Sequence, residues 1–200
     1  MMLVEQTTVA SGALPVAEFK DHLRLGTGFA DDGVQDAVLE GMLRAAMAQI
    51  EARTGKILLA RDFAWSVTAW RDLGAQVLPV APVSAISALK IVDRLGAEIV
   101  IDAGRYRLEP DHHRPKIIST SLVLPTIPVA GAAEIDFTAG FGPVWGDVPA
   151  DLSQAMFMLA GHYYEHRHEG AGAGTGEMPF GVNALIERYR NVRLFGGAGR

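Results

Sequence analysis

The chain has no cysteine, no long hydrophobic run and no excess of basic residues. Disulfides and thiol catalysis are therefore excluded, and the chain is suited to a reducing cytoplasm. The formal net charge is −5 at pH 7, whereas a dedicated nucleic-acid-binding domain is usually basic. No segment approaches the roughly 20 apolar residues that span a bilayer, and the N-terminus lacks the basic start of a secretory signal. We therefore expect a soluble cytoplasmic product that makes no contact with a membrane.

Apolar residues make up 49% of the 200 residues, which is enough for one domain with a sizeable core. Helical periodicity at both ends flanks a middle region of short alternating segments, which predicts an α+β fold. We expect helices over 14–55, an inserted, small and mostly antiparallel β-sheet region over 56–140, a long helix over 147–169, and a C-terminal helix with a flexible tail over 180–200. Residues 1–13 are expected to be an irregular lead-in, and glycine-rich residues 170–176 a flexible linker.

The long helix carries two apolar stripes, although a helix on the surface of a monomer needs only one. Leu152, Met156 and Leu159 belong to the first stripe, whereas Phe157, Gly161 and Tyr164 form the second. The second stripe predicts a contact with a neighbouring copy of the chain.

The preceding helix, expected from Asp31 or Asp32 to about Thr54, also has two faces. One face is bulky, and the other is lined by small residues that include Gly41, Ala45 and Ala48. Small side chains let another helix approach closely, so this face is a second candidate subunit interface. Gly55 is expected to cap the helix in a left-handed conformation.

The strands are expected within 56–70, 76–93 and 94–101, near 106–108 and 116–118, and over 132–140. The last of these shows the alternation most clearly, because Ile135 and Phe137 alternate with Glu134, Asp136 and Thr138. Pro79 and Pro82 interrupt the second segment and predict strand ends or edges there.

One short motif suggests catalysis. His162, Glu165 and His166 form H-x-x-E-H, the order of an inverted zinc-protease motif. A catalytic zinc needs a third protein ligand, for which only a few acids follow. The alternative interpretation is a polar helix end, where imidazoles lie near the negative pole of the helix dipole. No P-loop lysine and no G-x-S-x-G elbow is present, so we predict neither enzyme activity nor a cofactor.

Four stretches, taken together, resemble the head–tail connector (adaptor) proteins of long-tailed phages and of phage-derived gene transfer agents. They are LPVAEFKDHLRL, DDGVQDAVLEGMLRAAMAQIEARTGKILLARDF, FTAGFGPVWGDVPADLSQAMFMLAGHYYEHRH and MPFGVNALIERYR. The resemblance runs from about residue 14 to residue 190 and is loose over 70–130.

The resemblance implies a ring, usually of twelve copies, between the portal protein of the capsid and a tail-side stopper or head-closure protein. It implies a location at the head–tail junction of a virion or gene transfer agent particle made in the bacterial cytoplasm. DNA would pass through the lumen without specific binding. The rival hypotheses are a metal-dependent hydrolase built on His162, Glu165 and His166, and an unrelated oligomeric interaction module.

The end of the chain is a local basic segment on an acidic protein. Four arginines and no acid follow Glu187, and two apolar residues lie among them. We expect residues 180–200 to become ordered by docking on the portal, because arginine pairs well with carboxylates and apolar side chains fill pockets. The alternative interpretation is a disordered tail with a basic bias at the end of the helix. The candidate portal-binding residues are Arg188, Arg190, Arg193, Leu194 and Phe195.

Overall fold

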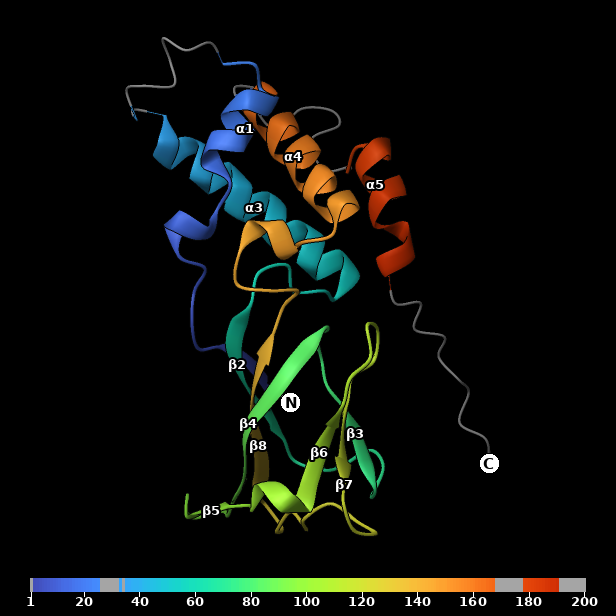
Figure 1. Ribbon diagram of the computed structural model, residues 1–200. Helices are drawn as coiled ribbons and strands as arrows, with labels where there is room; N and C mark the ends of the chain where they lie inside the picture. The colour runs from blue at the N-terminus through green and yellow to red at the C-terminus, as the bar shows by residue number, and fades with distance from the viewer. Residues whose placement is uncertain (1, 26–32, 34, 168–177, 191–200) are drawn as a thin grey trace.

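The computed structural model describes residues 2–25, 33, 35–167 and 178–190, and shows an elongated molecule with a helical layer at one end and a β layer at the other (Figure 1). The predicted α+β class is confirmed. Within the described part of the chain, no helix is both long and apolar enough to cross a membrane.

In the described residues, the helical layer contains four α-helices from distant parts of the sequence. They are α1 (Val16–His22), α3 (Asp36–Thr54), α4 (Ala150–Glu165) and α5 (Phe180–Ile186). Short 3-10 turns precede α1 (Ser11–Ala13) and α4 (Trp145–Asp147), and another follows α5 (Glu187–Tyr189). The two long helices, α3 and α4, pack together, and α1 and α5 lie on either side (Figure 1). Their shared core includes the fully buried residues Phe19, Leu39, Leu43, Ile50, Leu152, Met156, Val182 and Ile186.

The ends of α3 and α4 follow from local sequence. Gly55 takes the predicted left-handed conformation, with φ of 68°, and its N–H donates to the carbonyl of Glu51 at 2.8 Å. Pro149 directly precedes α4, where its missing N–H costs no hydrogen bond. The helix ends at Glu165, slightly before the predicted end.

The β layer is a sandwich of two antiparallel sheets. The larger has the order β1-β2-β8-β4-β5, and the smaller has the order β3-β7-β6. The strands are β1 (Met2–Glu5), β2 (Arg61–Val67), β3 (Ala75–Val77), β4 (Val83–Val92), β5 (Glu98–Val100), β6 (Tyr106–Glu109), β7 (Lys116–Ser119) and β8 (Ala132–Ala139). The sandwich core includes Phe63, Trp65, Leu89, Tyr106, Ile117, Ile135 and Phe137.

Two expectations need correction. The lead-in is not wholly irregular, because Met2–Glu5 form edge strand β1 on β2. The first strand of the β region, Arg61–Val67, lies within the predicted stretch 56–70, and residues 56–60 cross from one layer to the other with only isolated bridges. Residues 180–189 are ordered without a partner, because α5 packs on α4 in the isolated chain, with Val182 and Ile186 fully buried. The predicted linker and final segment lie outside the described residues.

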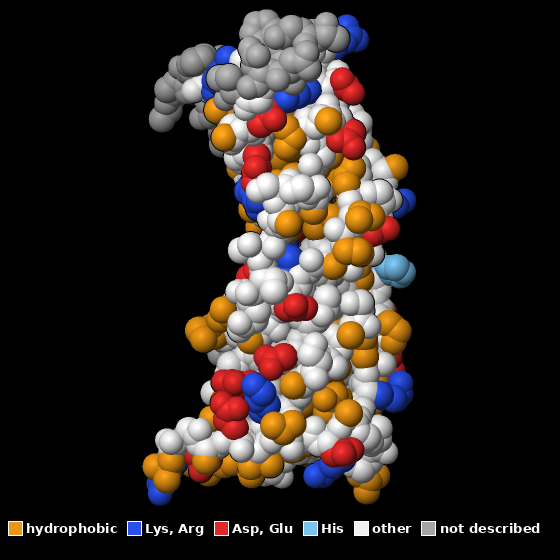
Figure 2. Space-filling model, turned by 60° about the vertical axis from the view of Figure 1, so that its left-hand side comes forward, with side chains coloured by type: hydrophobic (Ala, Val, Ile, Leu, Met, Phe, Trp, Pro, Cys, Tyr) orange, Lys and Arg blue, Asp and Glu red, His pale blue; other side chains and the backbone are white. Residues whose placement is uncertain are grey.

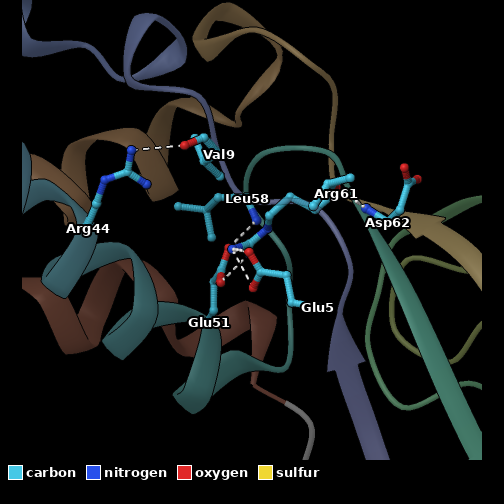
Figure 3. A network of polar contacts seen from close by, with 8 residues as sticks. Glu5, Val9, Arg44, Glu51, Leu58, Arg61 and Asp62 are labelled. Atoms are coloured by element: carbon cyan, nitrogen blue, oxygen red, sulfur yellow. Dashed lines mark hydrogen bonds and ion pairs between the residues drawn. The ribbon is translucent and has the colours of Figure 1, made fainter.

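A buried ion pair ties the two layers together (Figure 3). Arg61, at the start of β2, donates through Nη2 to both carboxylate oxygens of Glu51 on α3, at 2.6 Å from Oε1. Its Nη1 lies 3.2 Å from a carboxylate oxygen of Glu5 on β1. Glu51 also accepts the N–H of Leu58 at 2.9 Å. One guanidinium thus joins the last turns of α3 to both β1 and β2.

Candidate assembly interface

The outward face of α3 is lined by small residues and is open to solvent. Gly41, Ala45 and Ala48 are all exposed, and a Cβ added at Gly41 would meet no atom within 4 Å. Val38 continues the row and is 50% exposed. The opposite face of α3 is filled by buried core residues. Glycine in a helix interior costs about 1 kcal/mol relative to alanine, and contact of this row with another subunit stays a prediction.

A polar group beside this face is held in place by the lead-in. The guanidinium of Arg44 donates to Glu40 Oε1 at 2.7 Å and to the carbonyl of Val9 at 2.9 Å. Ser11 donates to the same carboxylate oxygen at 2.8 Å. The hydrogen bond from Arg44 lowers the pKa of Glu40 most, and the hydrogen bond from Ser11 lowers it further. This carboxylate is therefore ionised at neutral pH. The rim of the open face therefore carries a fixed pair of charges.

The second stripe of α4 is covered largely by α1 and neighbouring segments of the same chain. The ring of Phe157 lies 5.9 Å from that of Phe19 and 5.3 Å from that of Trp145. Gly161 is buried, and the hydroxyl of Tyr164 donates to Gln35 at 3.3 Å. These contacts account for the apolar character of the stripe within one chain. A contact of Phe157, Gly161 and Tyr164 with a neighbouring copy stays a prediction.

The H-x-x-E-H motif is located at the C-terminal end of α4. The rings of His162 and His166 have centroids 4.1 Å apart, and Nδ1 of His166 lies 2.9 Å from the carbonyl oxygen of His162. Glu165 is exposed to solvent. Among the described residues, no group of three or more His, Cys, Asp or Glu side chains could hold a metal ion. The arrangement resembles the polar helix end of the alternative interpretation.

The two described arginines of the C-terminal segment contact their own chain. Arg188 Nε lies 2.8 Å from Asp151 Oδ2, and its Nη2 donates to the hydroxyl of Tyr189, which in turn donates to Asp151. Burial raises the pKa of the Tyr189 hydroxyl, which therefore stays protonated as a donor. Arg190 pairs with Glu187 at 3.0 Å. The side chains of Arg188 and Arg190 are still 70% and 47% exposed. The other candidates, Arg193, Leu194 and Phe195, lie outside the described residues.

The Arg61 contacts that join the two layers were missed by sequence reasoning, although a signal was present. Arg61 has the same parity as Phe63, Trp65 and Val67, the inward-facing residues of β2. A charged residue at an inward position of an alternating strand predicts a buried partner.

Solved structures of gene transfer agent particles contain chains that are similar to this one over nearly its full length. The chain is 56% identical to a chain from the neck of an empty gene transfer agent particle computed with C6 symmetry, with a TM-score of 0.89 and full coverage of both chains. It is 52% identical, with a TM-score of 0.84 and full coverage of both, to a chain from the neck of a native particle computed with C12 symmetry. A chain from the virion of a native particle is 57% identical, with a TM-score of 0.86 over 98% of this chain and 99% of that one. No family model matches the chain, and no curated protein sequence does.

Sequence identity and structural similarity of this extent show that the chain is a structural component of the neck of a phage-like particle. The chain belongs to the head–tail connector proteins of gene transfer agents, the family that its sequence resembles. The predicted family and the predicted location in the particle are confirmed. The cyclic symmetry of the related necks also fits a component present in several copies around one axis.

Proposed function

We propose that this chain is the adaptor of a gene transfer agent or phage particle: twelve copies form a ring on the portal protein and join the capsid to the tail-side stopper or head-closure protein around the DNA channel. The observation that carries the proposal is the open small-residue face of α3 in a chain whose full-length relative comes from a neck with C12 symmetry. In a ring each copy contacts its two neighbours through two different surfaces, and this open face is a candidate for one of them.

The charge of the chain supports a channel through which DNA can move. Cationic groups are what make phosphate binding strong, and this chain has a net charge of −5. A ring of twelve such chains would not retain the polyanion by electrostatic attraction.

The ring is tested by placing a charge on the open face of α3. Ala48 is exposed, so Ala48→Arg should fold normally but bury an unpaired charge when two copies meet, at a cost of about 3–5 kcal/mol per contact. We expect the variant to be absent from particles and to stay free in solution. The matched control is Gln154→Arg, at an exposed position of α4. Normal incorporation of the Ala48→Arg chain would refute this interface.

Portal binding is assigned to residues 191–200, together with the exposed guanidinium groups of Arg188 and Arg190. Coupled ordering makes single contacts weak, but repetition around a ring multiplies them. A chain truncated after Arg190 retains every described contact of α5, so it should fold. We expect it to lose association with portal-bearing capsids. Association at the wild-type level would show that the portal-binding element lies elsewhere, and failure to co-purify even the full chain with a portal protein would favour an unrelated interaction module.

A further inference from the structure

The outward side of α5 carries an aromatic ring in solvent. Among the described residues, Phe180 is the largest exposed hydrophobic side chain of the helical layer, 88% exposed at the start of α5. Ala184 and Glu187 follow on the same side of the helix and are also exposed, whereas Val182 and Ile186 are buried on the side that packs on α4. Figure 2 shows that hydrophobic side chains reach the surface of the helical layer as well as that of the β layer. Aromatic side chains dominate the energetics of interfaces, so this ring marks a docking surface.

This side of α5 and the open face of α3 lie on opposite sides of the helical layer. α4 packs on both helices and lies between them (Figure 1). The open row of Gly41, Ala45 and Ala48 points away from the core face of α3, and Phe180 points away from α4. In a ring, each copy meets its two neighbours through two different surfaces. Two surfaces on opposite sides of one subunit can meet those two neighbours.

The helices α3 and α5 run in the same direction. Tyr164, near the end of α4, donates to Gln35, which directly precedes α3. Tyr189, which follows α5, donates at 2.7 Å to Asp151 in the first turn of α4. α4 is therefore antiparallel to both helices. Helices pack at crossing angles of about 20–50°, so α5 of one copy can lie along α3 of the next without exact alignment.

The two surfaces are complementary in size and in charge. The row on α3 leaves room for a ring, because a Cβ added at Gly41 would meet no atom within 4 Å. The exposed Arg53 lies eight residues after Ala45, or about 12 Å along the helix, and Glu187 lies seven residues after Phe180, or about 10–11 Å. The Glu187 side chain is 65% exposed, although it pairs with an arginine of its own chain. Charges of opposite sign at matching distances from the apolar contact favour one register.

We propose that Phe180 of one subunit packs on Gly41 and Ala45 of the next, with Glu187 beside Arg53 of the same neighbour. The partner is a second copy of this chain. The inference rests on the proposed ring and identifies the surface that covers the open face of α3.

Engineered cysteines test this contact, because the chain has none of its own. Within one copy, α3 and α5 are separated by two helix spacings, or roughly 16–20 Å, whereas the Cα atoms of a disulfide lie within about 7 Å. Phe180→Cys combined with Gly41→Cys or with Ala45→Cys can therefore cross-link only between copies. In oxidised particles we expect a ladder of covalent multimers from at least one of these pairs. Each single variant, and the control pair of Phe180→Cys with Leu95→Cys in the β layer, should stay monomeric.

A size swap tests the same contact without cross-linking. Gly41→Leu fills the space that the ring needs, and Phe180→Ala removes the ring. Each should lower incorporation into particles by at least about tenfold and leave the urea midpoint of the free chain nearly unchanged, because both positions are exposed. The double variant should recover most of the incorporation lost by Gly41→Leu. Normal incorporation of Phe180→Ala would overturn the proposal.

The Ala48→Arg variant separates this inference from the ring itself. If Ala48→Arg is excluded from particles but neither cysteine pair gives a ladder, the α3 interface stands and its assignment to Phe180 is wrong. If Ala48→Arg is incorporated normally and neither pair cross-links, the proposed α3 interface fails together with this contact. A Phe180→Cys chain that cross-links to a different particle protein would also overturn the proposal.

Discussion

The Arg61 ion pair allows the clearest prediction of stability. Arg61 and Glu51 have side chains only 7% and 12% exposed. Arg61→Met keeps much of the side-chain volume but leaves the Glu51 carboxylate buried, with the Leu58 N–H as its only remaining donor in the described part of the chain. Removing one partner of a buried ion pair costs about 3–5 kcal/mol. We expect that loss in the free energy of unfolding, measured by urea denaturation of the isolated chain.

Two further variants isolate the cause. Glu5, the other partner of Arg61, is 37% exposed, so Glu5→Gln should cost no more than about 1 kcal/mol. In the double variant Glu51→Gln with Arg61→Met, the amide oxygen can still accept from Leu58 while the buried charge is gone. We expect it to recover about 2 kcal/mol or more of the loss. If the double variant were as unstable as Arg61→Met alone, the buried-charge explanation would be wrong.

The same pair predicts a dependence on pH. Burial raises the pKa of Glu51, and the charge of Arg61 partly opposes that rise. A carboxyl with a raised pKa in the folded state gives stability that is complete below its unfolded pKa and is lost as the pH rises through its folded pKa. Without Arg61 the pKa of Glu51 should rise further. The deficit of Arg61→Met should therefore shrink as the pH falls, and a deficit that grew on acidification would contradict the sign of this argument.

The remaining predictions concern three other sites. Lys56 is 1% exposed, its Nζ has no hydrogen-bond partner among the described residues, and burial lowers its pKa; Lys56→Met should raise the free energy of unfolding by about 1–3 kcal/mol, with a smaller gain at alkaline pH, and a loss of stability at neutral pH would reveal an unseen partner. Gly140 has φ of 137°, and a Cβ there would lie 2.5 Å from Ala60 N; Gly140→Ala should lower the free energy of unfolding by at least about 1–3 kcal/mol, and an unchanged urea midpoint would contradict this. His162→Ala with His166→Ala should leave particle assembly and DNA delivery intact; normal assembly with abolished delivery, or zinc retained by the wild type through dialysis, would support the metal-dependent hydrolase instead.

The sequence predicted the elements that have strong internal periodicity. α3 and α4 have well-defined apolar stripes, and β8 alternates buried and half-buried residues along its whole length. The cap at Gly55 also followed from residue chemistry. Such signals are local, so they can be recognised without knowing what packs against them.

The rest depended on partners far away in the sequence. β1 is a four-residue edge strand whose only described partner strand, β2, begins more than fifty residues later, so no short-range pattern marks it. The second stripe of α4 suggested a neighbouring copy, whereas α1 covers Phe157 and Gly161 within the chain. The interface role of Gly41, Ala45 and Ala48 stays a prediction, and the structure adds that this row is open.

The most direct test of the central claim is a cryo-electron microscopy reconstruction of the neck of particles that carry this chain. The proposal predicts a ring of twelve copies next to the portal, in which the open face of α3 meets the neighbouring subunit. A neck that lacks the chain, or that holds its copies without contact through α3, would contradict the account.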